Sequence, residues 1–167
     1  MKYELQKITR LSGHRASIYS VLVVEDKETL LDKFIKENSK NYPSEVKDIL
    51  QRMRTIGQKT GAREIFFKPG EGKGGDGICA LYDNPDKKLR LYCIRNGNVN
   101  VILGGGGEKP RTMRSFQESP KLTNENYFLR AVSQLIYQRI KEKDIRYSQN
   151  GMDLEGELTF EDNDLQY

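Results

Sequence analysis

The sequence has little of the chemistry that metal sites and nucleophilic hydrolases use. Among 167 residues there is one histidine, His14, and there are two cysteines, Cys79 and Cys93. Two cysteines in apolar, strand-like runs and one histidine do not make a four-ligand zinc site. A Ser–His or Cys–His pair would have to use His14, which follows Gly13 in a predicted turn. We therefore expect no metal, no cofactor and no conventional hydrolase chemistry.

Long apolar runs are also missing. No stretch approaches the ~20 apolar residues of a membrane-spanning helix. The first residues lack the apolar region of a secretion signal. Cysteines within apolar runs are typical of buried, reduced thiols. Together these absences predict a cytoplasmic protein that does not use a membrane.

Positive charge, in contrast, is abundant and unevenly distributed. Six acidic residues and no lysine or arginine follow Asn150, so residues 1–150 carry 28 basic against 18 acidic side chains. This excess favours polyanions, because each neutralised phosphate releases counterions. Many basic domains are merely soluble, so charge alone leaves an RNA partner open. The division predicts a single domain over 1–150 and an acidic strand or tail over 151–167, whose carboxylates could fold over a basic sheet face.

Periodicity predicts an α+β fold. Alternation over 2–9 and the β-branched run 16–24 indicate an antiparallel hairpin. Helices are expected over 27–38, from Pro43 to Gly57 or Gly61, and over 124–143. Further strands are expected over 64–68, 77–82, 89–95 and 99–103, with a hairpin turn at Gly97. The predicted architecture is an N-terminal hairpin and a helical hairpin packed on an antiparallel sheet, with a C-terminal helix.

Two glycine-rich segments could approach a phosphate. Residues 70–75 fit the pattern G-x-G-x-x-G, but they precede a strand rather than a helix, so a loop between strands is the preferred interpretation. The run Gly104–Gly107 follows an apolar strand and could present N–H groups to a phosphate beside Lys109, Arg111 and Arg114. A plain flexible turn is the alternative.

Since His14 lies in a predicted turn without an orienting partner, RNA cleavage would depend on arginine, lysine and tyrosine. Arginine and lysine can stabilise the charge of a pentacovalent phosphate. Arg90 and Tyr92 alternate in one strand with Leu89, Leu91 and Cys93. If the leucine face packs on the helices, Arg90 and Tyr92 look out from an open face of the sheet. A solvated, charged face without activity is the alternative.

The order of these elements resembles the RelE/HigB superfamily of bacterial toxins. The similar region covers approximately residues 27–143. It contains two helices, a meander with Leu89-Arg90-Leu91-Tyr92, a glycine turn, and Val101-Ile102-Leu103 followed by glycines and Lys109. The resemblance implies a RelE-like fold and a ribosome-dependent mRNA endonuclease that uses no metal. It also implies two partners, a cognate helix-turn-helix antitoxin and mRNA on the ribosome.

Carried over by position, Arg90 matches the family's strand arginine, and Lys109 matches the second of its post-strand lysines. Tyr92 stands one position earlier than the family's tyrosine, Glu108 replaces a frequent lysine, and glycine replaces the aromatic residue before it. Two alternatives stay open: a non-catalytic RNA- or antitoxin-binding module on the same fold, and a ParE-like gyrase poison. The candidate catalytic residues are Arg90, Tyr92, Lys109 and Arg111, and the candidate RNA-binding residues are Lys68, Lys73, Arg95, Arg114 and Arg139, with Tyr137 as a further candidate.

Overall fold

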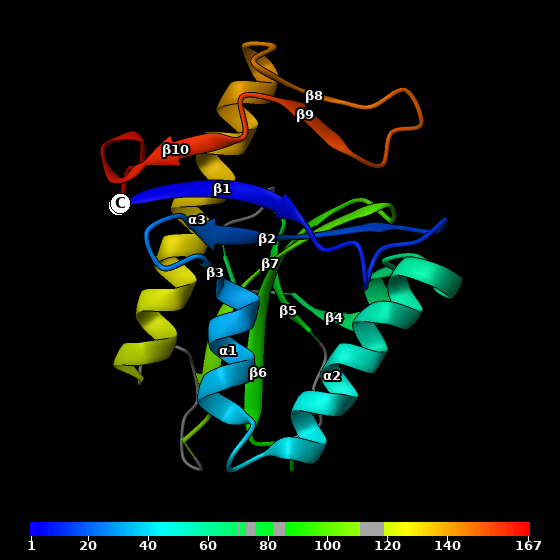
Figure 1. Cartoon of the computed structure of the whole chain (residues 1–167), viewed down its shortest axis with the longest axis vertical. Coiled ribbons are helices and arrows are strands. Elements are labelled where there is room, and N and C mark those ends of the chain that lie inside the picture. Colours follow the sequence, from blue (N-terminus) through cyan, green and yellow to red (C-terminus); the bar gives the residue numbers. More distant parts are fainter. Residues whose placement is uncertain (70, 73–75, 82–85, 111–118) are drawn as a thin grey trace.

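A twisted sheet forms the centre of the molecule (Figure 1). The computed structural model describes residues 1–69, 71–72, 76–81, 86–110 and 119–167. The helices are α1 (Leu30–Asn38), α2 (Pro43–Thr55) and α3 (Pro120–Lys141), with short helical turns at Ile56–Thr60, Glu64–Phe66 and Asp162–Asp164. The strands are β1 (Lys2–Lys7), β2 (Ser17–Val23), β3 (Glu28–Thr29), β4 (Phe67–Lys68), β5 (Ile78–Leu81), β6 (Leu89–Asn96), β7 (Asn100–Glu108), β8 (Ile145–Tyr147), β9 (Leu154–Gly156) and β10 (Thr159–Glu161). The predicted α+β class is confirmed.

The main sheet is mostly antiparallel. Its strands lie in the order β10-β1-β2-β7-β6-β5-β4, and β3 pairs with the end of β2. The pairing of β2 with β7 is parallel, and the other pairings are antiparallel. Strands β8 and β9 form a separate antiparallel hairpin. The chain leaves β2, builds both helices and the β4–β6 strands, and returns at β7 to the middle of the sheet.

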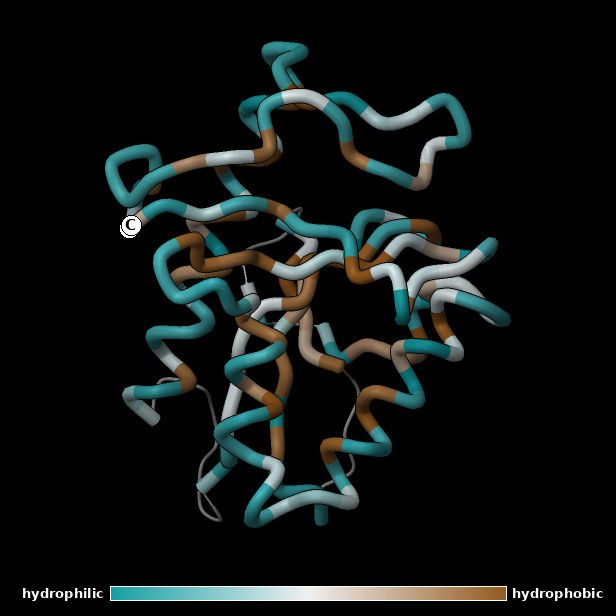
Figure 2. The backbone as a smooth tube through the Cα atoms, viewed as in Figure 1, coloured by the Kyte–Doolittle hydropathy of each residue, from teal (hydrophilic) through white to brown (hydrophobic). Residues whose placement is uncertain are grey.

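Both faces of the sheet are covered, which gives three layers. Helices α1 and α2 pack on one face, where Leu31, Phe34 and Met53 are buried. Helix α3 packs on the other face through Leu129, Val132 and other buried residues. Figure 2 shows that hydrophobic residues concentrate along the central strands, whereas the peripheral turns are hydrophilic. No helix of the described chain combines the length and apolar character that a membrane crossing needs.

Local sequence signals determine where the helices begin. Thr29 caps α1, since its hydroxyl accepts from the Asp32 N–H and the Asp32 carboxylate accepts from the Thr29 N–H. Pro43 occupies the first turn of α2. Helix α3 begins at Pro120, four residues before the predicted start, because Ser119 provides the cap. Its apolar periodicity is weak before Tyr127, so periodicity alone places the start too late.

Two predicted elements differ from the structure. Only Phe67 and Lys68 of the expected strand 64–68 pair with β5, because Glu64–Phe66 is a 3₁₀ turn and Ile65 is exposed. The run Gly104–Gly107 is neither a flexible turn nor a lip after the strand. It lies inside β7, where Gly106 and Gly107 pair with Leu91 and Arg90.

The acidic C-terminal segment forms strands. β10 pairs with β1 and is the edge strand of the main sheet, with Lys2 opposite Glu161. The N-terminal ammonium lies 2.9 Å from Asp162 Oδ2, and the Tyr3 hydroxyl donates to the same carboxylate at 2.7 Å. The segment therefore extends the sheet at its edge and does not fold over a basic face.

The β8–β9 hairpin is fastened to β1 and β2 by polar contacts. Asp153 accepts a hydrogen bond from the Ser17 hydroxyl, and its carboxylate lies 3.0 Å from Lys7 Nζ. The Leu154 N–H donates to the Tyr19 hydroxyl at 2.9 Å. The Ser17 hydrogen bond, followed by the contact with Lys7, holds the pKa of Asp153 below its usual value.

This lowered pKa predicts a pH-dependent contribution to stability. The ionised Asp153 stabilises the folded chain above the usual aspartate pKa of about 4, and this contribution is lost as the pH falls through the lower folded pKa. The side chain is 34% exposed, so after allowance for solvent screening we expect Asp153→Asn to cost about 1 kcal/mol at pH 7. Urea unfolding at a series of decreasing pH values should show this difference shrink and vanish once the pH lies below the folded pKa of Asp153. The exposed Asp48→Asn serves as control, and a difference that persists at low pH would contradict the assignment.

Candidate functional site

Arg90 is the second residue of β6 and lies in a polar, buried environment on the α3 side of the sheet. Its exposure is 8%. The guanidinium Nη1 lies 3.9 Å from Oε1 of Glu71, which is itself 7% exposed. Among the residues that the structure describes, Arg90 Nε has no hydrogen-bond partner. A buried ion pair of this length leaves part of the guanidinium unsatisfied, which is costly unless another group supplies the bond.

Asn126 completes this group of polar residues. It is fully buried in the second turn of α3, and its Nδ2 donates to the backbone carbonyl of Glu71 at 2.8 Å. Its Oδ1 accepts no hydrogen bond from any described residue. We call Arg90, Glu71 and Asn126 the Arg90 cluster. Unsatisfied polar atoms in a buried cluster need a physical explanation, and a binding or catalytic role is one.

The glycines of β7 make this close arrangement possible. A Cβ on Gly105 would lie 2.1 Å from Glu125 Oε2, and one on Gly106 would lie 1.9 Å from the Arg90 carbonyl oxygen. A side chain at Gly105 would displace the Glu125 carboxylate, and one at Gly106 would displace the backbone of β6. The glycine run has a packing role here: it lets α3 approach the end of the sheet.

Lys109 follows the glycine strand on the same side of the sheet as Arg90. Gly107 is the register partner of Arg90, and Lys109 lies two residues further along, where its N–H donates to Lys88 O at 2.7 Å. Since alternate residues share a face, Arg90 and Lys109 lie on the α3 side. Lys109 is half-buried. The structure thus brings two of the predicted catalytic residues to one end of one face.

The expectation that Arg90 and Tyr92 look out from an open sheet face is wrong. Tyr92 is fully buried and Arg90 nearly so. The alternation itself is as predicted, because Leu89 and Leu91 pack on the side of α1 and α2. The opposite face is covered by α3, which packs against Tyr92 and Ile94.

The other candidate residues lie apart from the Arg90 cluster. Lys68 is exposed on the edge strand β4. Arg95 donates to the carbonyl of Ala62 at 2.7 Å, and it lines a pocket with Tyr137 at the other end of β6. Arg139 is buried and donates to two carbonyls of the C-terminal segment. Lys73, Arg111 and Arg114 lie outside the described residues.

Lys121 sits between two carboxylates beside the glycine strand. Its Nζ lies 3.2 Å from Glu125 and 3.4 Å from Glu37, so it links the first turn of α3 to α1. Burial works against the charged form, but the two carboxylates outweigh it and raise the pKa of Lys121. The ammonium is therefore charged at neutral pH and is already paired.

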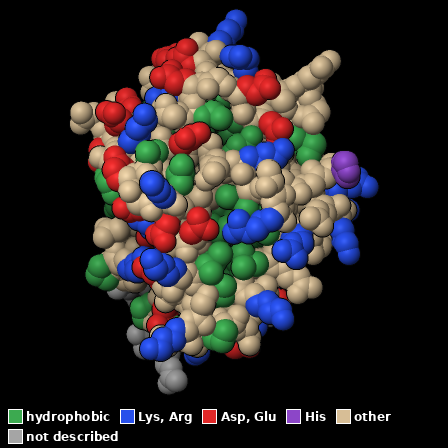
Figure 3. Space-filling model, viewed as in Figure 1, with side chains coloured by type: hydrophobic (Ala, Val, Ile, Leu, Met, Phe, Trp, Pro, Cys, Tyr) green, Lys and Arg blue, Asp and Glu red, His purple; other side chains and the backbone are tan. Residues whose placement is uncertain are grey.

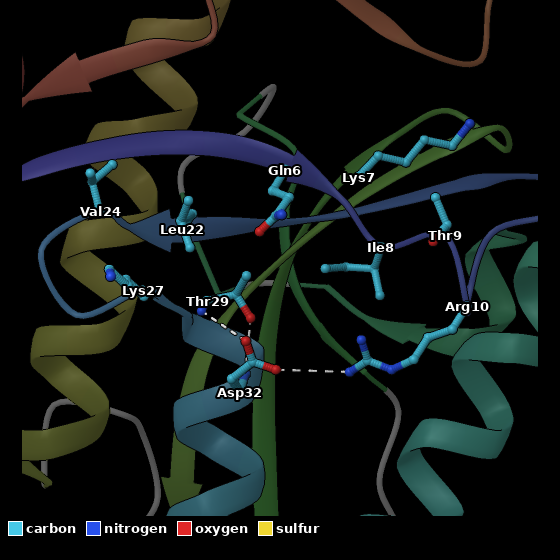
Figure 4. Close-up of a pocket in the computed structure, with 10 residues that line it drawn as sticks. All are labelled: Gln6, Lys7, Ile8, Thr9, Arg10, Leu22, Val24, Lys27, Thr29 and Asp32. Atoms are coloured by element: carbon cyan, nitrogen blue, oxygen red, sulfur yellow. Dashed lines mark hydrogen bonds and ion pairs between the residues drawn. The ribbon is translucent and has the colours of Figure 1, made fainter.

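A hollow lies on the sheet face opposite the Arg90 cluster, beside β1, β2 and the start of α1 (Figure 4). Lys7, Arg10 and Lys27 supply its positive charge, and its volume is about 630 Å³. Figure 4 shows Arg10 extending across the hollow toward Asp32, whose Oδ1 lies 3.8 Å from its Nη2. Lys7 is paired with Asp153, so two of the three cations already have a carboxylate partner.

Sequence reasoning missed Glu71 and Asn126. Glu71 belongs to the glycine-rich segment 70–75, whose pattern predicts only a loop between strands, and Asn126 is one polar residue in an amphipathic helix. They are 55 residues apart, so no local pattern links them. Within the described part of the chain, no group of three His, Cys, Asp or Glu side chains is placed to hold a metal ion.

Comparisons of the chain with protein-family models, with curated proteins and with solved structures found no match. The functional assignment therefore depends on the geometry of the site and on the resemblance in element order.

Proposed function

We propose that the protein is an mRNA endonuclease toxin of RelE/HigB type, which acts on the ribosome without a metal and is neutralised by an antitoxin. The observation that carries the proposal is the Arg90 cluster: a buried arginine with an unsatisfied Nε, on the same face and end of the sheet as Lys109. The element order also supports it, since α1, α2, the strands β4–β7 and α3 follow one another as in the resemblance.

Arg90 and Lys109 have separate roles in this proposal. Arg90 binds the scissile phosphate and stabilises the charge of the pentacovalent state, since a guanidinium in a dry site interacts strongly with phosphate oxygens. In the resting protein Glu71 neutralises Arg90, and the phosphate replaces this carboxylate when RNA binds. Lys109, which is half-buried, provides a second positive charge at the same end of the sheet. Tyr92 is fully buried and contributes to the core rather than to the reaction.

A second candidate function is a non-catalytic RNA- or antitoxin-binding module. The burial of Arg90 favours it, because a guanidinium that is only 8% exposed offers little surface to a substrate. The basic excess of residues 1–150 would then bind RNA from the surface without cleavage.

Induced expression in bacteria tests the proposal. We expect the wild-type chain to arrest growth and to produce cut transcripts, and we expect Arg90→Lys and Lys109→Ala to relieve both effects. Arg90→Lys keeps the charge opposite Glu71 but loses the planar geometry that binds two phosphate oxygens. The matched control is Arg146→Ala, an exposed arginine on β8.

Each alternative has its own result in this experiment. A well-folded wild-type chain that leaves growth and transcripts unchanged overturns the nuclease and favours the binding module. Broken DNA with intact transcripts indicates a gyrase poison. If Arg146→Ala relieves arrest as fully as Arg90→Lys, the Arg90 cluster is not the site. Thermal unfolding of each variant shows whether it is folded.

A further inference from the structure

An apolar groove with a positive rim runs between α1 and α2, on the sheet face opposite the Arg90 cluster. Its volume is about 580 Å³. Its apolar floor consists of Ile35, Val46 and Leu50, and its rim cations are Lys47, Arg54 and Lys59. Figure 3 shows hydrophobic atoms at the centre of this face, with lysine and arginine side chains gathered on the side of α2.

The residues that line the groove follow one stripe of α2. Lys47, Leu50 and Arg54 line it at intervals of three and four residues, so one stripe of α2 faces it along its length. The 13 residues of α2 span about 20 Å. Ile35 and Leu50 are only half-buried, whereas the neighbouring Phe34 and Met53 are almost completely enclosed in the core. The floor is therefore an apolar strip beside the core.

The charge of the groove points to the chemistry of its occupant. None of the residues that line it is acidic. The ion pairs found in the described part of the chain include none of the three rim cations. The hollow beside β1 differs in this respect, because Asp32 and Asp153 already neutralise two of its cations. The α1–α2 groove thus combines an apolar floor with three rim cations that form no ion pair with any described residue.

We propose that this α1–α2 groove binds one acidic amphipathic helix of a partner protein. The apolar side of that helix lies on the floor, and its aspartate and glutamate residues pair with the rim cations. Helix-in-groove binding of this kind uses anchors at i, i+3, i+4 and i+7. Single-stranded RNA would also be attracted by the rim, but it needs exposed aromatic rings for stacking, and the lining has none. The proposal is independent of the nuclease.

A displayed library of helices of about 15 residues tests the proposal. Apolar residues are kept at i, i+3, i+4 and i+7, and the remaining positions vary among acidic, basic and neutral residues. Selection uses the full chain. We expect acidic helices to be enriched. Their affinity for the wild-type protein should be about tenfold higher than their affinity for the Lys47→Glu/Arg54→Glu variant. Leu50→Ser should weaken the binding of the same peptides. The control Lys141→Glu/Arg146→Glu, which lies far from the groove, should leave their binding unchanged.

Three results would overturn the proposal. The first is enrichment of basic or neutral helices, or no enrichment at all. The second is an acidic peptide whose affinity is unchanged by Lys47→Glu/Arg54→Glu while thermal unfolding shows that variant to be folded. The third is an RNA oligonucleotide that loses affinity with this double substitution when no peptide does, which assigns the groove to nucleic acid. A positive result stands whether or not the chain arrests growth.

Discussion

Replacing Gly106 with alanine should lower the free energy of unfolding by about 3 kcal/mol. A Cβ at this position would lie 1.9 Å from the carbonyl oxygen of Arg90 and 2.9 Å from its carbonyl carbon. These are backbone atoms of the neighbouring strand, so the clash cannot be relieved by rotating a side chain. Strand β6 has to move away from β7, at the point where Arg90 and Leu91 pair with the glycines.

Gly107→Ala is the matched control for this substitution. A Cβ on Gly107 would meet its nearest neighbour, Lys121 Cε, at 3.4 Å, which is close to ordinary van der Waals contact. We expect a change within about 0.5 kcal/mol, since nothing in the backbone needs to move. Urea unfolding of both variants measures the difference. Equal stability of Gly106→Ala and Gly107→Ala would show that β6 and β7 leave room for a methyl group at Gly106.

Arg139→Ala should destabilise the chain by about 3 kcal/mol. Its Nη1 donates to the carbonyls of Glu157 and Thr159 at 2.8 and 2.7 Å. Its Nη2 lies 3.8 Å from the Glu157 carboxylate and 3.9 Å from that of Asp164. Arg139 is 8% exposed, so removing it leaves two partly buried carbonyls without this donor. The guanidinium is the main polar link between α3 and the C-terminal strand.

The effect of Arg139→Ala should be local as well as global. We expect limited proteolysis to cut within residues 154–161 faster than in the wild type, because β10 loses its attachment to α3. Lys141→Ala, an exposed change two residues further along the same helix, should leave both stability and cleavage unchanged. If the two variants behave alike, the C-terminal strand is held by its pairing with β1 and not by Arg139.

Local patterns in the sequence predicted most of the secondary structure. The spacing of Leu31 and Phe34 and the position of Pro43 gave two helices close to their observed bounds. The Asn96-Gly97-Asn98 segment gave the β6–β7 hairpin, with Gly97 at a φ of 64°. These features depend on residues within one or two turns of each other, and such signals are readable in a single chain.

The surroundings of the candidate site could not be predicted in this way. Strand β6 carries Leu89, Leu91 and Cys93 on one face and Tyr92 and Ile94 on the other. A strand covered on both faces has such a composition, but one arginine among these residues suggested an open face. The glycine run has no side-chain pattern, so its place in β7 is decided by pairing with β6. The contact between Glu71 and Asn126 joins distant segments that only the folded chain brings together.

The position of β10 has a consequence for how copies of the chain behave toward each other. An unpaired outer strand is a template for hydrogen bonding with another polypeptide. β10 occupies that place alongside β1, and its Thr159 and Glu161 side chains are exposed. A chain shortened before Thr159 would present the backbone of β1, including Tyr3 and Leu5, to any neighbour at high concentration. The C-terminal strand, a short edge with an acidic residue, thus covers β1 and limits self-association, and shortened variants would precipitate more readily even with the Arg90 cluster untouched.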